Sequence, residues 1–237
     1  MLVRYLIKFT KESKIKFIAH LDIMRTIQKG VRRSGLPAQY SRGFNPHMAL
    51  SIAQPLSVGV YSSGEYMDLI LLEEVAEDEI LEKLKATSAQ GIEFLEVTKI
   101  VEEENAKKLP QGMALIDACR YTIKISYKDT KMLEGELKSL LEEKEWTTLK
   151  KSKKGEREVD IKALVYEFEF SINSEELVIN ALIQSGSREH LSANLLISYI
   201  KERTSNANED AFVDIKREEM YYLMDDKLVP LCNVGRM

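Results

Sequence analysis

The residues best suited to chemistry in this sequence stand in one short segment, SRGFNPH, at positions 41–47. Arg42 offers a planar set of donors that matches a phosphate or a carboxylate. Phe44 can stack on a nucleic-acid base. His47 can donate or accept a hydrogen bond and can titrate near neutral pH. These types predict a segment that binds an anionic partner, which could be a phosphate-bearing strand of RNA, a phosphorylated metabolite or an acidic patch of another protein.

The backbone of the same segment is expected to turn sharply. Gly43 permits a positive φ and the close approach of a ligand, and Asn45 followed by proline favours a turn. Ser41 and Ser51 add hydroxyl donors on either side of this turn. A second interpretation stays open, in which glycine and proline only turn the chain and Phe44 packs into the core.

A basic helix is predicted just before this segment, from about His20 to Ser34, with Gly35 and Pro37 as stop signals. Its apolar side is formed by Ile23, Met24, Ile27 and Val31. Its opposite side carries four basic residues, so the helix is expected to pack by one stripe and to present cations on the other. The candidate RNA- or anion-binding residues are Arg25, Lys29, Arg32, Arg33, Ser41, Arg42, Gly43, Phe44, Asn45, His47 and Ser51.

The charge distribution supports an anionic partner. The whole chain has a net charge of −4, but residues 1–60 carry ten basic and two acidic side chains, a net of +8, which leaves −12 for the remainder. Such an asymmetry creates a local positive field within an acidic protein. A lysine-rich solvated surface without a partner is the alternative.

His20 allows two interpretations. Its helical position with Met24 and Ile27 favours a partly buried histidine with satisfied hydrogen bonds. At the mouth of the helix it could instead act with His47 as the acid–base pair of a metal-independent endoribonuclease. No catalytic residue is otherwise indicated.

Other chemistries have no matching pattern. The sequence contains no P-loop, no GxGxxG after a strand and no GxSxG. The three histidines and two cysteines are scattered, so we expect no metal site and no cofactor. Cys119 and Cys232, the lack of a signal peptide and the lack of a long apolar run predict a cytoplasmic protein without a membrane partner.

Hydrophobic periodicity predicts the same order of elements twice: strand, helix, strand, strand, helix, strand. The expected fold class is α+β, with two ferredoxin-like β-α-β-β-α-β units in tandem and antiparallel sheets. We expect the first unit at 1–101, a connector at 102–112 and a second, acidic unit at 113–237. Residues 177–184, LVINALIQ, are predicted as a strand of a hairpin, although a helix over SEELVINALI is the alternative. Trp146 is expected to be a core anchor.

The segments AHLDIMRTIQKGVRRSGLP and YSRGFNPHMALSIAQPLSVGVYSSGEYMD resemble a bacterial family of unknown function that is linked to radical S-adenosylmethionine (SAM) proteins. The resemblance is strongest over residues 1–73 and continues more faintly to the final strand. The matching positions are His20, Asp22, Arg25, Arg32, Arg33, Gly35, Leu36, Pro37, Ser41, Gly43, Phe44, Asn45, Pro46, His47, Ser51, Pro55, Leu56, Gly59, Glu65 and Asp68. Met48 departs from the family, which usually has a second proline there, and SREHLSANLL lacks the Arg-Pro that often starts the corresponding helix.

The resemblance implies an accessory role. Members of that family occur either fused behind a cobalamin-binding radical SAM protein or as a stand-alone neighbour, so radical chemistry would belong to a partner. Genes for stand-alone members often lie near those for a ribonuclease and ribosomal proteins, which implies RNA rather than DNA. We therefore expect a non-catalytic RNA-binding or substrate-presenting partner of a radical SAM protein. The endoribonuclease and a structural module that binds only protein remain the alternatives.

Overall fold

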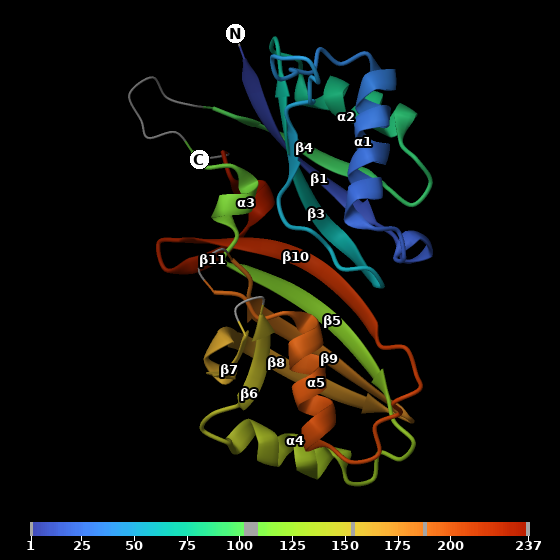
Figure 1. Ribbon diagram of the computed structural model, residues 1–237, viewed down its shortest axis with the longest axis vertical. Coiled ribbons are helices and arrows are strands. Elements are labelled where there is room, and N and C mark those ends of the chain that lie inside the picture. The colour runs from blue at the N-terminus through green and yellow to red at the C-terminus, as the bar shows by residue number, and fades with distance from the viewer. Residues whose placement is uncertain (1, 102–108, 153–154, 187–188, 236–237) are drawn as a thin grey trace. The chain divides into compact units, whose positions relative to one another are not determined.

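The computed structural model describes residues 2–101, 109–152, 155–186 and 189–235 (Figure 1). Contacts divide the chain into two compact units, Met1–Asp117 with Arg217–Met237 as unit 1 and Ala118–Lys216 as unit 2. The predicted division differs at the C-terminus, because the segment from Arg217 onward packs with the first unit. Most of the predicted connector, residues 102–108, lies outside the described residues.

Unit 1 has the predicted β-α-β-β-α-β order. Its elements are β1 (Val3–Lys11), η1 (Ser13–Ile15), α1 (His20–Ser34), β2 (Leu50–Ile52), β3 (Val60–Leu71), α2 (Glu77–Thr87) and β4 (Phe94–Ile100), followed by α3 (Gly112–Leu115). The strands run β4-β1-β3, and β2 pairs with the second half of β3 through Leu50↔Leu69 and Ile52↔Met67. All of these pairs are antiparallel, which is the ferredoxin-like arrangement.

The C-terminal part of the chain adds β10 (Asp214–Met224), β11 (Lys227–Pro230) and η3 (Leu231–Asn233). Within unit 1, β10 lies beside β3. Gly64 permits this close approach, because a Cβ at that position would lie 2.6 Å from the carbonyl oxygen of Glu218.

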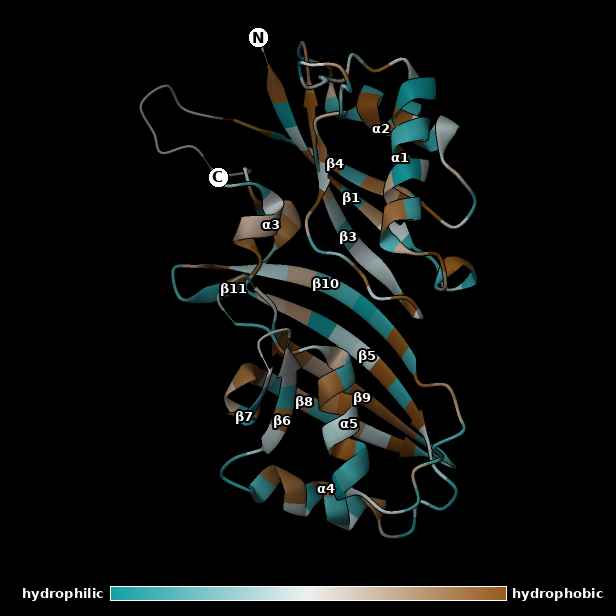
Figure 2. Ribbon diagram, in the orientation of Figure 1, coloured by the Kyte–Doolittle hydropathy of each residue, from teal (hydrophilic) through white to brown (hydrophobic). Residues whose placement is uncertain are grey.

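The helix α1 forms as its sequence pattern predicts. Ile23, Ile27 and Val31 are buried against the sheet, while the basic residues face solvent. Gly35 ends the helix in the left-handed region, with φ at 72°, which a residue with a side chain adopts less readily. Figure 2 shows the resulting mixture of hydrophobic and hydrophilic residues along α1.

The core of unit 1 lies between the two helices and one face of the sheet. Its largest buried side chains include Tyr5, Phe9, Met67, Leu69 and Leu71. Burial of such side chains contributes about 1.5–3 kcal/mol each. The core therefore holds α1 and β3 as the rigid base of the segment between them.

Unit 2 repeats the plan with an insertion. Its elements are β5 (Ala118–Ser126), α4 (Leu133–Glu142), β6 (Thr147–Ser152), β7 (Gly155–Asp160), η2 (Lys162–Leu164), β8 (Val165–Asn173), β9 (Glu176–Gln184) and α5 (Ala193–Arg203), and β10 begins in its last residues. The strands β5, β9 and β8 form antiparallel neighbours, and β6 and β7 form a separate two-stranded sheet. The fold is therefore α+β with two antiparallel ferredoxin-like units in tandem.

Two finer predictions for unit 2 are confirmed. LVINALIQ is a strand, because the alternating residues of β9 are buried and the segment pairs with β5 and β8. Trp146 is a core anchor that is 1% exposed, and its Nε1 donates to the Leu140 carbonyl oxygen at 2.9 Å.

Cys119 and Cys232 are not joined by a disulfide. Within the part of the chain that the structure describes, no helix combines the length and apolar composition needed to cross a bilayer.

Candidate functional site

The SRGFNPH segment forms a loop that is exposed at every residue from Ser41 to His47. Two hydrogen bonds close its base: the Ser41 amide donates to the His47 carbonyl oxygen at 2.8 Å, and the His47 amide donates to Ser41 Oγ at 2.9 Å. Tyr40 and Met48 form a β-bridge directly behind these bonds. The loop is thus fixed at its base while its other side chains remain open to solvent.

Phe44 has the exposure of an isolated side chain, 112%. This contradicts the interpretation in which Phe44 packs into the core. Gly43 just before it has φ at 125°, as expected for a glycine that turns the backbone. A fully exposed phenyl ring has no role in packing, so it is available for stacking on a ligand.

The helix α1 approaches this loop through Arg32. Arg32 Nε donates to the hydroxyl of Tyr40 at 3.3 Å, at the base of the loop. Lys29, one turn earlier, is exposed. Neither Lys29 nor Arg42 has an ion pair or hydrogen bond to another described side chain. The structure therefore brings Lys29, Arg32 and the loop to one exposed region.

Two of the predicted cations are engaged elsewhere. Arg25 Nη1 forms an ion pair with Asp22 Oδ1 at 2.9 Å. Arg33 Nη2 donates to the Thr87 carbonyl oxygen at 2.7 Å, at the C-terminal end of α2. This carbonyl is one of those that a helix end leaves without an intrahelical donor, so Arg33 caps α2. Arg33 thus joins the two helices rather than the loop.

Ser41 and Ser51 also differ from expectation. Ser41 Oγ accepts the hydrogen bond that closes the loop. Ser51 is half-buried in β2, opposite Asp68 of β3, and does not belong to the loop. The exposed binding groups are therefore Lys29, Arg32, Arg42, Phe44, Asn45 and His47.

A second polar cluster lies inside unit 1, behind the first turn of α1. Lys11, His20 and Glu65 line a recess with room for about one water molecule, together with apolar side chains of β1, α1 and β2. Glu65 is 3% exposed and Lys11 is 2% exposed. Lys11 Nζ donates to the Lys16 carbonyl oxygen at 2.9 Å.

Arg217 of β10 completes this cluster. Its Nε and Nη2 donate to the two carboxylate oxygens of Glu65 at 2.8 and 2.6 Å, a bidentate ion pair. Nη2 also donates to the Gln54 carbonyl oxygen at 3.1 Å. Arg217 is 1% exposed, so its charge needs the Glu65 carboxylate as a counter-charge in the buried cluster.

The recess lowers the pKa values of two of its basic groups, His20 and Lys11. Burial lowers the pKa of His20 below its ordinary 6.5, and the charges of Arg217 and Lys11 act in the same direction, while Glu65 opposes them. Burial likewise lowers the pKa of Lys11, with Arg217 adding to the effect and Glu65 opposing it. His20 thus favours its neutral form in the folded protein.

The structure does not bring His20 and His47 together. His20 opens onto the recess, whose lining does not include His47. His47 lies in the loop whose base contacts Arg32, and the helical rise from His20 to Arg32 is about 18 Å. Each histidine therefore acts in its own environment.

Sequence patterns did not single out Lys11, Gln54 or Arg217 as a cluster with Glu65. The one available signal is Glu65 itself, a carboxylate within the strand SGEYMDLIL, whose other side chains are mostly apolar. A buried carboxylate needs a cation or several donors. The cation that pairs with Glu65 comes from β10, 152 residues later in the chain.

Among the described residues, no group of three or more His, Cys, Asp and Glu side chains is placed to hold a metal ion.

Comparison with known proteins gives a family. A family model described as "Uncharacterized protein conserved in bacteria (DUF2344)" matches residues 4–193. No curated protein matches the chain.

Two solved structures are similar to this chain. A chain of the "Crystal Structure of a Cbf5-Nop10-Gar1 Complex" has 12% identity and a TM-score of 0.49, covering 91% of this chain and 48% of that chain, so that this chain spans about half its length. The "Crystal Structure of an Unknown Protein from Galdieria sulphuraria" has 9% identity and a TM-score of 0.26, covering 92% and 98% of the two chains. Since the family model spans most of the sequence, the chain belongs to the DUF2344 family of uncharacterized proteins conserved in bacteria.

Proposed function

We propose that this protein binds single-stranded RNA through the SRGFNPH loop and the adjoining part of α1. The observation that carries the proposal is Phe44, an aromatic side chain that is 112% exposed on a loop with a fixed base. Single-stranded RNA is recognised by aromatic stacking combined with cations that follow the phosphates.

The charges around the ring support RNA over an uncharged ligand. Lys29, Arg32 and Arg42 have no carboxylate partner among the described residues, whereas Arg25 is neutralised by Asp22. A cation without a carboxylate partner has no ion pair to break when it binds a phosphate, and the release of counterions favours binding. An acidic protein surface would use the same cations but would have no need for a flat exposed ring.

The experiment measures fluorescence anisotropy of a labelled 12-nucleotide RNA of mixed sequence at several salt concentrations. The variant carries Lys29→Ala, Arg32→Ala and Arg42→Ala. We expect its salt slope to fall by about 2, since each phosphate contact with a single strand contributes about 0.7. The control removes the same number of positive charges from unit 2, where Lys131 and Lys138, which are paired with Asp129 and Glu134, are changed to alanine together with the exposed Lys144.

Two results would contradict the proposal. One is wild-type binding without a salt slope. The other is an equal loss in the α1–loop variant and in the unit 2 control, which would mean that only overall charge matters. RNA that binds the wild type and is cleaved would instead point to the endoribonuclease alternative.

The proposed partner is a radical SAM protein, for which the RNA-binding surface would present a substrate. This part rests on the resemblance of residues 1–73 alone. Co-purification of the full chain with the radical SAM proteins of the same cell tests it, with residues 118–216 deleted in a second preparation. If the full chain retains no radical SAM protein, the proposed partner is wrong. The proposal of RNA binding does not depend on this result.

A further inference from the structure

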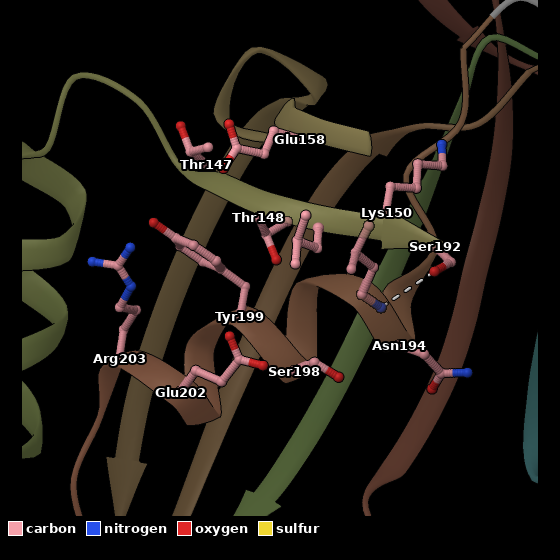
Figure 3. A pocket seen from close by; sticks show the side chains of 12 residues that line it. Thr147, Thr148, Lys150, Glu158, Ser192, Asn194, Ser198, Tyr199, Glu202 and Arg203 are labelled. Atoms are coloured by element: carbon pink, nitrogen blue, oxygen red, sulfur yellow. Dashed lines mark hydrogen bonds between the residues drawn. The ribbon is translucent and has the colours of Figure 1, made fainter. Parts of the chain in front are cut away.

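Unit 2 contains an open groove that the RNA proposal does not use. It has a volume of about 720 Å³ and lies between β6 and α5 (Figure 3). Four successive residues of β6, Thr147 to Lys150, line one wall, and α5 residues from Asn194 to Arg203 line the other. From β7, only Glu158 lines the groove. This wall is therefore the edge of β6 that does not pair with β7. The volume lies in the range of protein ligand sites.

The hydrogen-bond register shows which backbone groups this edge exposes. β6 has β7 as its sole strand neighbour among the described residues. The Ile161 amide donates to the Trp146 carbonyl oxygen at 3.0 Å, so Trp146 bonds toward β7. Bonding alternates along an antiparallel strand, so Thr148 and Lys150 also bond toward β7. Thr147 and Leu149 must then direct their N–H and C=O groups to the other side, where α5 lies.

The charged side chains of the groove are unequally engaged. Lys150 Nζ donates to the His190 carbonyl oxygen at 2.7 Å. Arg203 lies 3.6 Å from a carboxylate oxygen of Glu143 and over the ring of Tyr199. Glu158 and Glu202 make no ion pair or hydrogen bond with the rest of the described chain, and Figure 3 shows them on β7 and α5. The groove therefore presents two uncommitted carboxylates, whereas its two cations, Lys150 and Arg203, already have partners within the chain.

We infer that this groove binds an extended, basic segment of another polypeptide, which adds to β6 as a third strand. An extended peptide supplies alternating N–H and C=O groups that can pair with those of Thr147 and Leu149, which is the mode of strand addition at a sheet edge. Lysine or arginine side chains on the peptide meet Glu202 and, across β6, Glu158. The four lining residues of β6 span about 13 Å, enough for a segment of about four residues.

The test uses the full chain and a display library of random nine-residue peptides. We expect the selected peptides to be enriched in lysine or arginine. A selected peptide is then measured against Leu149→Pro, which removes the N–H that faces the groove and is tolerated because it leaves the bonds to β7 in place. Leu149→Ala is the matched control, since it shortens the same side chain and keeps the N–H.

We expect Leu149→Pro to weaken the selected peptide about tenfold and Leu149→Ala to leave its affinity within about twofold. Glu202→Gln should weaken binding about threefold, and this difference should vanish at high salt. Hydrogen exchange of the Thr147 and Leu149 amides should slow when the peptide binds.

The inference is overturned if no peptide is selected by the folded chain. It is also overturned if Leu149→Pro and Leu149→Ala weaken binding equally, because the side chain and not the strand edge would then carry the contact. Selection of acidic peptides would contradict the charge argument. If Leu149→Pro does not fold, the hydrogen exchange of the wild-type chain decides, and unchanged exchange of the Thr147 and Leu149 amides on peptide binding overturns the inference.

Discussion

The SRGFNPH loop and the recess behind His20 use similar residues for opposite purposes. Both lie in unit 1, and both combine arginine, histidine and a nearby glycine. The loop exposes its cations and its ring, whereas the recess buries Arg217 against Glu65. The loop leaves its charge available to a ligand. In the recess, the charge of Arg217 is paired with Glu65 and holds β10 to β3.

The difference shows that burial, more than residue type, separates a binding group from a structural one. Arg42 and Arg217 have the same chemistry, but only Arg42 can be reached from solvent. Arg33, on the same helix as Arg32, caps α2. Substitutions in the recess should therefore change stability, and substitutions in the loop should change binding.

The largest effect is expected from Glu65→Ala. This change leaves the Arg217 guanidinium buried without a counter-charge, which should lower the free energy of unfolding by about 3–5 kcal/mol. Urea unfolding followed by circular dichroism measures it. The double variant Glu65→Met with Arg217→Met should be closer to wild type, because it removes both charges together. Equal losses in the single and double variants would show that the ion pair has no such role.

A pair of glycine substitutions should sharpen the same contrast. Gly64→Ala places a Cβ 2.6 Å from the Glu218 carbonyl oxygen, and this contact belongs to backbone that cannot easily move. We expect a loss of about 1–3 kcal/mol in the free energy of unfolding.

Gly43→Ala is the matched control in the loop. It meets nothing within 4 Å, although its φ of 125° makes the substitution strained. Gly43→Ala should therefore alter mainly the loop conformation. We expect it to reduce RNA affinity and to lower the free energy of unfolding by less than Gly64→Ala does. Thermal unfolding together with anisotropy separates the two quantities. A Gly64 variant as stable as wild type would mean that β10 does not approach β3 so closely.

Phe44→Ala should reduce RNA affinity while leaving the fold intact. Loss of one base–aromatic stack corresponds to about 1–3 kcal/mol of binding free energy. The stability should change by less than about 0.5 kcal/mol, since the ring packs against nothing. Phe17→Ala is the control, because Phe17 is also exposed, at 62%, but lies before the first turn of α1. Equal losses in the two variants would argue against a specific role for the loop.

The smallest effect concerns the pH dependence contributed by His20. Its pKa is lowered in the folded state from 6.5, mainly by burial, so the unfolded chain binds a proton first as the pH falls. The stability contributed by neutral His20 is thus fully present above about pH 6.5, the pKa of the unfolded chain. It is lost as the pH falls from there toward the lowered pKa of the folded state.

His20→Gln should flatten this part of the stability curve. Urea unfolding at about pH 7.5 and about pH 5 compares the variant with wild type, and the difference between the two pH values should be smaller in the variant. His47→Gln is the control, since His47 is exposed in the loop. An unchanged pH dependence in His20→Gln would mean that His20 does not contribute to the change in stability over this pH range.

Much of the fold follows from local patterns in the sequence. Alternating apolar residues specify β1 and β9, and the apolar stripe of α1 with Gly35 after it specifies that helix and its end. These features depend on residues close together in the chain, so periodicity and stop signals predict them. The turn at Gly43 belongs to the same class.

The tertiary structure alone decided which polar groups are available. The sequence supplied Arg32 and Arg33 as equivalent neighbours, and only the packing of α2 against α1 sends one to the loop base and the other to Thr87. The partner of Glu65 comes from β10, and the free edge of β6 emerges only once β7 has taken the other edge. Such pairings depend on segments far apart in the chain, and local sequence patterns contain no information about the distances between them.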